Sequence, residues 1–227
     1  FQIAPCFRDE DARSDRSPGE FYQLDIEMSF VEQEDVFEVI QKLMVNLFKN
    51  FSKKKIMFEN FPKIPFNEAM DKYGTDKPDL RNPLIIHDIS KIFIREDVKF
   101  EIFNKLIKSG SVAKAIVTKK TSNKPRSFFD NIDKWAKEQG WSGLAYFTIE
   151  KDDKGKLIGK GPIGKFFSDD AIQEIMKITS AGVDDSIFMS CSNKSEVYEI
   201  MSKSRNKIGE DLNIIEQNCF AFCWITD

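Results

Sequence analysis

The chain has 227 residues, of which 41% are hydrophobic and 31% charged, and its formal net charge is -3 at pH 7. This length gives room for one large domain or two small ones. The slightly negative charge argues against a generally basic nucleic-acid binder, so any RNA contact must come from local patches such as residues 53–55 or 119–126.

Apolar runs and cysteine content indicate the cellular compartment. No apolar run approaches the ~20 residues needed to cross a bilayer, and no signal peptide opens the chain, so we expect no membrane association. Four cysteines without a dense framework favour a reducing cytoplasm. The chain begins within a strand pattern and stops in an apolar run, which predicts an internal piece of a longer protein.

The first thirty residues predict two strands joined by a charged loop. Side chains alternate along a strand, so one face of the first strand holds Gln2, Ala4, Cys6 and Arg8. One face of the second strand, taken as residues 21–30, holds Phe21, Gln23, Asp25 and Glu27, and the other holds Tyr22, Leu24, Ile26, Met28 and Phe30. The polar set would suit a ligand with an ammonium, a planar ring and a phosphate. A solvated edge-strand face is the alternative.

A helix is predicted next, over residues 31–52. Its apolar side chains recur at three- and four-residue steps: Val36, Val39, Ile40, Leu43, Leu47 and Phe51. Glu34 and Asp35 lie in its first turn, where the helix dipole favours acidic groups. We expect this helix to pack against the apolar face of the preceding strand. Residues 53–83 are rich in loops and prolines, with a short helix at 67–73.

From residue 84 short strands and helices alternate. The predicted helices cover residues 98–108, 127–140, a segment opened by Ser168, and 193–206, with Ser127 and Asn193 among the expected caps. The predicted strands cover residues 111–118, 144–150, 157–158, 186–190 and 220–226. This pattern indicates an α+β fold in which 84–212 are inserted between 1–83 and 213–227.

Several short sequence motifs resemble those of a known family. The runs CFRDED, R-x-D-R and EF-x-Q-x-D-x-E at residues 6–27 resemble motif 2 of class II aminoacyl-tRNA synthetases, in the version of bacterial aspartyl-tRNA synthetases. The run YGTDKPDLR at residues 73–81 resembles a downstream signature of the same enzymes. Residues 84–212 resemble their insertion domain, often called the GAD domain. The resemblance covers nearly the whole chain.

This resemblance implies a function. The fold would be part of an antiparallel catalytic sheet with helices, plus the inserted α+β domain. The parent would be a cytoplasmic ligase that activates L-aspartate with ATP and transfers it to tRNA(Asp). It would be a homodimer whose interface motif is absent here, and Mg²⁺ would accompany ATP with ligands mostly outside this chain. The isolated chain would be inactive. The alternative is a catalytically dead paralogue that serves as a tRNA-binding or interaction module.

The resemblance also assigns the nucleotide-binding residues. The motif 2 arginine, here Arg8, contacts the ATP α-phosphate and the aspartate carboxylate, which makes it the catalytic residue. Asp9 and Glu10 lie in the nucleotide-binding turn, and Phe21 stacks on adenine. If the run FRDE stood alone, the simplest interpretation of Arg8 would be a surface ion pair with Asp9 or Glu10. Bacterial relatives often have glutamine where Ser17 stands, which puts that ATP contact in doubt.

The remaining assignments concern aspartate and tRNA. Gln23, Asp25 and Glu27 match the amide and the acidic floor of the amino-acid pocket. The loop arginines Arg13 and Arg16 could approach the tRNA acceptor end. An interpretation of equal weight is that they form solvated ion pairs with neighbouring aspartates.

Two further patterns are weaker. Residues 159–165, GKGPIGK, have the spacing of a phosphate-binding loop, but Phe166 lacks the hydroxyl for magnesium and Pro162 lacks a backbone donor.

Cys219 and Cys223 have few potential metal-ligating partners, and His87 is the one histidine of the chain. The sequence therefore predicts no metal site.

Overall fold

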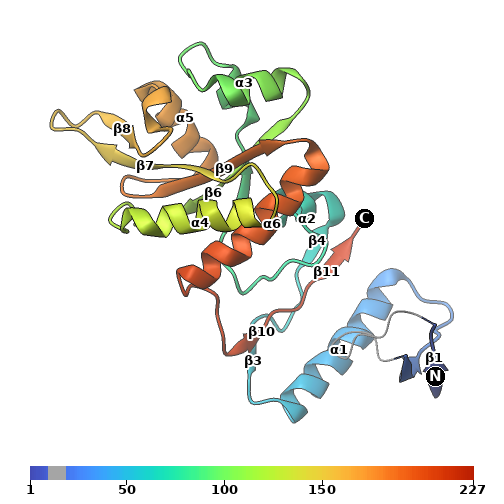
Figure 1. Cartoon of the computed structure of the whole chain (residues 1–227). Coiled ribbons are helices and arrows are strands. Elements are labelled where there is room, and N and C mark those ends of the chain that lie inside the picture. The colour runs from blue at the N-terminus through green and yellow to red at the C-terminus, as the bar shows by residue number, and fades with distance from the viewer. Residues whose placement is uncertain (10–18) are drawn as a thin grey trace. The chain divides into compact units, whose positions relative to one another are not determined.

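The computed structural model describes residues 1–9 and 19–227, which form two compact units, Phe1–Lys53 and Lys54–Asp227. In the first unit, β1 (Gln2–Phe7) and β2 (Glu20–Asp25) pair antiparallel, and α1 (Gln33–Phe51) follows (Figure 1). The Arg8 backbone N–H donates to the Gly19 carbonyl at 2.9 Å, which extends the ladder by one rung. The two predicted strands and the helix are therefore present.

The second strand is shorter than predicted. It ends at Asp25 rather than Phe30, so the expected alternation over residues 26–30 is wrong. Phe30 has φ = 58°, a left-handed conformation that cannot continue a strand. The helix then begins after Glu32, whose backbone N–H donates to the Asp35 carboxylate at 2.9 Å in a reciprocal capping box.

The first unit has little core of its own. None of the residues of α1 is buried, although its apolar stripe is clear. Ile26 and Met28, which follow β2, line a small hollow together with Val36, Val39 and Ile40 of α1. The other apolar side chains of the hairpin, Ile3, Tyr22 and Leu24, stay exposed. The apolar face of the preceding strand therefore meets the helix at Ile26 and Met28, while Tyr22 and Leu24 of the same face remain exposed.

The two ends of the second unit lie side by side. β3 (Lys55–Ile56) pairs in parallel with β10 (Cys219–Phe220), and β4 (Lys63–Pro65) pairs in parallel with β11 (Trp224–Thr226). The short helix α2 (Phe66–Tyr73) follows β4 (Figure 1). The strand predicted at residues 220–226 is thus split in two, and each half meets a strand from the other end of the unit.

Between these ends lies one antiparallel sheet. Its strands, in spatial order, are β5 (Ile86–Asp88), β6 (Val112–Thr118), β9 (Ser186–Ser192), β7 (Ala145–Lys151) and β8 (Leu157–Lys160). The helices are α3 (Glu101–Lys108), α4 (Arg126–Glu138), α5 (Asp169–Thr179) and α6 (Lys194–Asp211), with single turns η1 (Ser90–Ile94) and η2 (Gly164–Phe166). The α+β class is confirmed.

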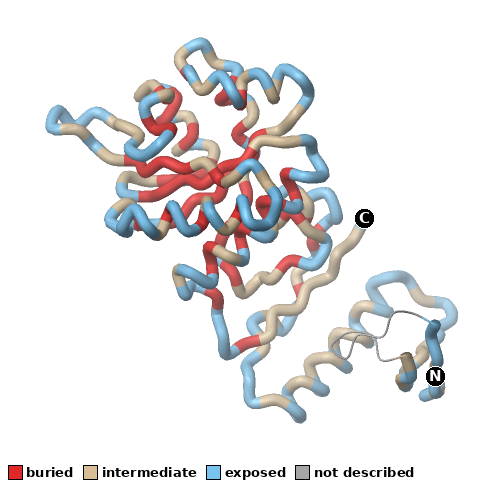
Figure 2. The backbone as a smooth tube through the Cα atoms, in the orientation of Figure 1, coloured by how far each residue is buried: buried red, intermediate tan, exposed pale blue. Residues whose placement is uncertain are grey.

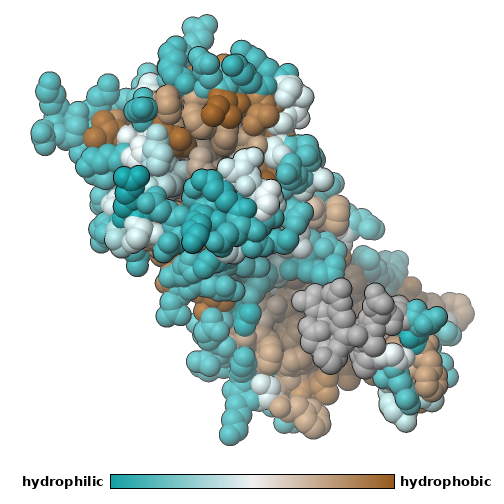
Figure 3. All heavy atoms as spheres, viewed as in Figure 1, coloured by the Kyte–Doolittle hydropathy of each residue, from teal (hydrophilic) through white to brown (hydrophobic). Residues whose placement is uncertain are grey.

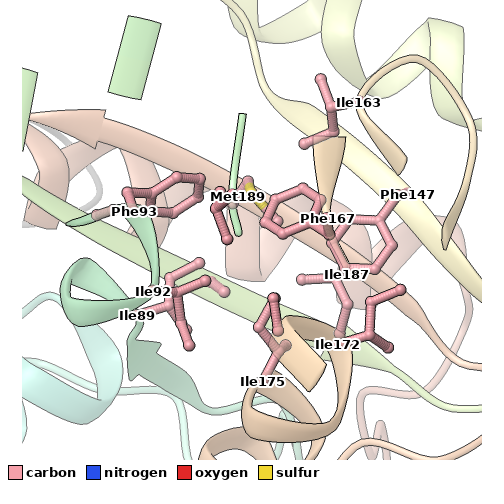
Figure 4. Close-up of a cluster of buried hydrophobic side chains, with 14 of the residues drawn as sticks. Ile89, Ile92, Phe93, Phe147, Ile163, Phe167, Ile172, Ile175, Ile187 and Met189 are labelled. Atoms are coloured by element: carbon pink, nitrogen blue, oxygen red, sulfur yellow. The ribbon is translucent and has the colours of Figure 1, made fainter. Parts of the chain in front are cut away.

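Helices cover both faces of this sheet, so its central strands are buried on both sides (Figure 2). On β6, Ala113, Ala115 and Val117 join the cluster that includes side chains of α3, α5 and η1. Figure 4 shows part of this cluster, including Ile172 and Ile175 of α5 and Phe93 of η1. Ile116 faces the opposite cluster, which includes side chains of α4 and α6. The outer face around α4 and α6 is mostly hydrophilic (Figure 3). This alternation gives the second unit two substantial apolar cores.

The helix ends test the predicted caps. Ser168 accepts a hydrogen bond from the Ala171 N–H at 3.0 Å, and Asn193 accepts one from the Glu196 N–H at 3.0 Å, so both caps are confirmed. The cap at Ser127 is wrong, because Pro125 occupies the N-cap of α4 and its fixed φ suits that position. α6 extends beyond the predicted end because its last turns, including Ile208, remain buried.

We expect the two units to differ sharply when expressed apart. A fragment of residues 54–227 should give a dispersed NMR spectrum and a cooperative thermal transition, because it contains both apolar cores. A fragment of residues 1–53 should remain largely unfolded, because none of its described residues is buried. Dispersed amide resonances from the 1–53 fragment would contradict this expectation.

Candidate functional site

The predicted polar side chains of the opening hairpin lie along one face. The register places Phe21 opposite Cys6, Gln23 opposite Ala4 and Asp25 opposite Gln2. Opposite residues of an antiparallel pair project to the same side, so the two predicted polar faces form one surface. Phe21, Gln23 and Asp25 are half-buried there, whereas the opposite face is exposed. This is the arrangement that the ligand-binding hypothesis requires.

An arginine and an aromatic ring meet at the loop end of this face. The Arg8 guanidinium lies 5.3 Å from the centroid of the Phe21 ring, within cation–π range. Arg8 is exposed, and Asp9 is exposed immediately after it. A guanidinium held over a ring presents a flat, permanently charged fork to an anion while the ring offers a stacking surface. Glu10, Arg13, Arg16 and Ser17 lie outside the described residues.

Two carboxylates gather at the opposite end of the hairpin. Asp25 and Glu27 line a cavity of ≈ 310 Å³ together with Phe1 and Gln2. Glu27 follows the end of β2 instead of lying within it, and it nevertheless reaches the same cavity as Asp25. The Gln2 side-chain amide donates to the Asp25 carboxylate at 3.2 Å. A cavity with two carboxylates can attract a cationic group such as an ammonium.

The distance between the two ends of the hairpin face limits the shape of a ligand that could bind there. Phe21 and Asp25 are four residues apart on one strand, which corresponds to about 13 Å at ~3.3 Å per residue. A ligand that touches both ends must therefore be elongated, with a planar group at the Phe21 end and a cation at the Asp25 end. Gln2 had no predicted role, although its alternation with Arg8 already placed it on this face.

The second matched segment, residues 73–81, packs against α6. Gly74 has φ = 71°, and a Cβ atom at this position would lie 2.5 Å from the Tyr198 carbonyl oxygen, so only glycine fits. Asp79 accepts two hydrogen bonds from the Arg81 guanidinium, at 2.9 and 2.7 Å, which lower the pKa of this carboxyl. Gly74 thus brings the start of the segment close to α6, and the Asp79–Arg81 ion pair closes its end.

One buried arginine ties this segment to α6. The Arg205 side chain is 1% exposed and donates to the carbonyl of Leu84 at 2.6 Å. The Arg205 Nη2 group donates to the carbonyls of Asn82 at 2.6 Å and Asp79 at 3.0 Å. The Asn82 amide donates back to the Arg205 carbonyl at 2.8 Å. Burial lowers the pKa of Arg205 to about 10, so it stays protonated at neutral pH.

The segment with phosphate-loop spacing has a packing role. Gly159 lies on β8 and Gly164 on η2, and the two glycines touch. A Cβ atom on Gly164 would lie 2.2 Å from the Gly159 carbonyl oxygen, so a side chain here would force β8 and η2 apart. These glycines are explained by the close approach of two backbones.

The cysteine, histidine and acidic side chains are the groups of this chain that could ligate a metal ion. Within residues 1–9 and 19–227, no group of three or more histidine, cysteine, aspartate or glutamate side chains is placed to hold a metal ion. Cys219 is buried and Cys223 partly buried, and burial raises the pKa of both thiols. None of the helices in the described part of the chain is long and apolar enough to span a membrane.

His87 supplies a pH-dependence that can be tested. It lies on β5 opposite Ala115, and its pKa is lowered by burial and then by the charge of Lys119. Because the folded pKa lies below the unfolded value near 6.5, the folded state binds fewer protons than the unfolded one. The contribution of His87 to stability is therefore complete above pH 6.5 and declines as the pH falls toward the folded pKa.

The measurement uses the fact that the chain has 1 histidine. Its imidazole proton resonance, followed by NMR from pH 8 to 4.5, should titrate with a midpoint below 6.5 in the folded protein and near 6.5 in urea. A folded midpoint at or above the urea value would contradict the burial of this side chain.

Comparisons with known proteins show the family of the chain. The family model described as tRNA synthetases class II (D, K and N) matches residues 1–227. The chain is 68% identical over its whole length to the Aspartate–tRNA(Asp/Asn) ligase of Pelagibacter ubique, of which it covers 38%. It is 52% and 48% identical over its whole length to proteins of the same name from Ehrlichia chaffeensis and Rickettsia felis, covering 37% of each. The chain thus belongs to the class II tRNA synthetases of the D, K and N family, and it spans a little over a third of the length of these relatives.

Proposed function

We propose that this chain is the part of an aspartate–tRNA ligase that contains the motif 2 hairpin and the GAD-type insertion. The observation that carries this proposal is the single hairpin face that holds Arg8, Phe21, Gln23 and Asp25. A ring and an arginine at one end and two carboxylates at the other suit an aspartyl-adenylate. The names of the most similar relatives support the same reaction.

In the proposed reaction, a carboxylate oxygen of L-aspartate attacks the α-phosphorus of ATP. The bond to the leaving pyrophosphate breaks, and aspartyl-adenylate forms. Arg8 holds the α-phosphate and the aspartate carboxylate together and offsets the negative charge that builds up between them. The terminal adenosine hydroxyl of the tRNA then attacks the aspartyl carbonyl and releases AMP. No covalent intermediate with the protein is required.

The other residues of the face bind the two halves of the ligand. Phe21 stacks on adenine, with Asp9 and Glu10 beside it in the nucleotide-binding turn. Gln23, Asp25 and Glu27 form the aspartate pocket, where the carboxylates attract the substrate ammonium or orient basic groups. Gln2 supports this pocket through its hydrogen bond to Asp25.

Further features of the longer protein belong to the same proposal. It uses Mg²⁺ with ATP, with ligands mostly outside this chain. It is a cytoplasmic homodimer. Arg13 and Arg16 contact the tRNA acceptor end. Residues 84–212 form the insertion between 1–83 and 213–227, as the pairing of β3 with β10 and of β4 with β11 suggests.

The relatives' names extend the proposal to the choice of tRNA. These proteins are named for both tRNA(Asp) and tRNA(Asn), so we propose that the longer protein charges both with aspartate. The test is aminoacylation with labelled aspartate on each purified tRNA. Charging of both supports the proposal, and charging of tRNA(Asp) alone would restrict it. Failure to charge either would overturn it.

The 227-residue chain alone should be inactive in ATP–pyrophosphate exchange. It covers 38% of the Pelagibacter relative, and its first unit leaves apolar side chains such as Tyr22 and Leu24 exposed. A pocket on such an uncovered hairpin lacks the enclosure that holds two substrates in line. Aspartate-dependent exchange by the purified chain would contradict this prediction.

A further inference from the structure

A second cavity, unrelated to the hairpin residues, lies in the larger unit. Its volume is ≈ 590 Å³. Its walls come from the chain entering β5, the end of β6 with the following loop, the end of α5 and the chain leaving α6. The lining residues are Pro83, Leu84, Ile85, His87, Val117, Lys119, Lys120, Thr121, Lys124, Thr179, Ser180, Leu212 and Ile214. This volume falls within the range of small-molecule sites, roughly 300–1,000 Å³.

The cavity combines an apolar wall with positive charge. Apolar residues from three separate segments, Leu84, Val117 and Leu212, form one side. Three lysines also line it, at positions 119, 120 and 124. Within the described part of the chain, no aspartate or glutamate lines this cavity. An apolar ligand body would be buried here with its negative group near the lysines.

The lysine-bearing loop is held in a fixed shape. Thr121 is buried and donates to the Ser186 hydroxyl at 2.7 Å, while the Lys120 backbone N–H donates to the Asp185 carboxylate at 2.9 Å. The Lys119 ammonium is held by Asp185 at 3.0 Å, and the Lys120 ammonium lies 3.5 Å from Asp184. These acidic groups partly offset two of the three lysines, which leaves Lys124 as the main positive charge for a ligand. A preformed loop reduces the entropy lost on binding.

We propose that this cavity binds a small amphipathic anion, with an apolar body and one carboxylate or phosphate group. The body contacts the wall around Leu84, Val117 and Leu212. The anionic group meets Lys124, with Lys119 and Lys120 beside it. This site does not depend on the ligase activity proposed above, because none of its lining residues belongs to the hairpin.

The test uses His87 as a built-in reporter, since it lines the cavity and is the only histidine of the chain. Octanoate is titrated into the 227-residue chain at constant pH 8, where the imidazole is neutral, and its ring proton is followed by NMR. We expect a saturable shift with octanoate and with octyl phosphate. Octylammonium should give none over the same concentrations. His87 itself lines the cavity, so its ring proton reports on a probe bound there.

Variants separate specific binding from surface adsorption. Lys124→Glu, at an exposed position, should raise the dissociation constant for octanoate about tenfold or more, because it reverses the main charge at the cavity. Lys134→Glu on the exposed face of α4 is the matched control and should leave it unchanged. Ile214→Trp, which fills the cavity from a partly exposed position, should abolish the shift.

Three results would overturn the proposal. One is the absence of a saturable shift with either anion. Another is an equal shift with octylammonium, which would mean that charge plays no part. The third is unchanged octanoate binding by Lys124→Glu. A preference between octanoate and octyl phosphate would identify the anionic group of the natural ligand.

Discussion

Replacing Arg8 with alanine in the longer protein is expected to lower aspartate-dependent ATP–pyrophosphate exchange by about 10³-fold. The guanidinium lies over Phe21 on the face that carries the aspartate-binding candidates, and in the proposed reaction it contacts both the α-phosphate and the carboxylate. Its removal takes away charge stabilisation in the transition state and the alignment of the two reactants. The loss should therefore appear in kcat as well as in kcat/KM.

Two further variants sharpen this test. Arg8→Lys keeps the charge but loses the planar fork, so its activity should lie between those of the alanine variant and the parent. Lys42→Ala removes an exposed cation on α1 that pairs with Glu38, and it should leave the exchange rate unchanged. Near-normal turnover by Arg8→Ala would count decisively against the role given to this residue.

Arg205→Ala is expected to lower the free energy of unfolding of the larger unit by about 4 kcal/mol. The change leaves the buried carbonyls of Leu84 and Asn82 without their donor, and each such loss costs about 1–3 kcal/mol. It also removes a large side chain that is 1% exposed. All 3 tryptophans of the chain lie beyond residue 54, so their fluorescence in a urea titration reports on this unit.

The neighbouring position gives the matched control. Asn206 is exposed on the same helix, and Asn206→Ala should change the free energy of unfolding by no more than about 0.5 kcal/mol. Arg205→Lys should fall between the two, since one ammonium cannot reproduce the fork that serves three carbonyls. A loss below about 1 kcal/mol for Arg205→Ala would mean that water or a rearranged backbone replaces these hydrogen bonds.

Local rules predicted much of the fold. Period-two alternation placed Arg8 and Asp25 on a common face, and the register confirms that face. Capping chemistry located the starts of α5 and α6 at Ser168 and Asn193. These features depend on residues close together in sequence, so they are visible without the fold.

Other features depend on contacts between distant segments. Arg205 looks like an ordinary helical arginine, because its acceptors near residue 82 are more than a hundred positions away. The end of β2 at Asp25 could not be predicted either, because no sequence signal marks the left-handed conformation of Phe30. The anion cavity joins the chain entering β5 to the chain leaving α6, so its residues could not be grouped from the sequence alone.

In the proposed function, the hairpin forms half of an aspartyl-adenylate pocket. The most direct test is a crystal structure of the longer protein bound to a non-hydrolysable sulfamoyl analogue of aspartyl-adenylate. We predict that the adenine stacks on Phe21, the sulfamoyl group contacts Arg8 and the ammonium lies near Asp25 and Glu27. An analogue bound without contact to Arg8 or Phe21 would contradict the account.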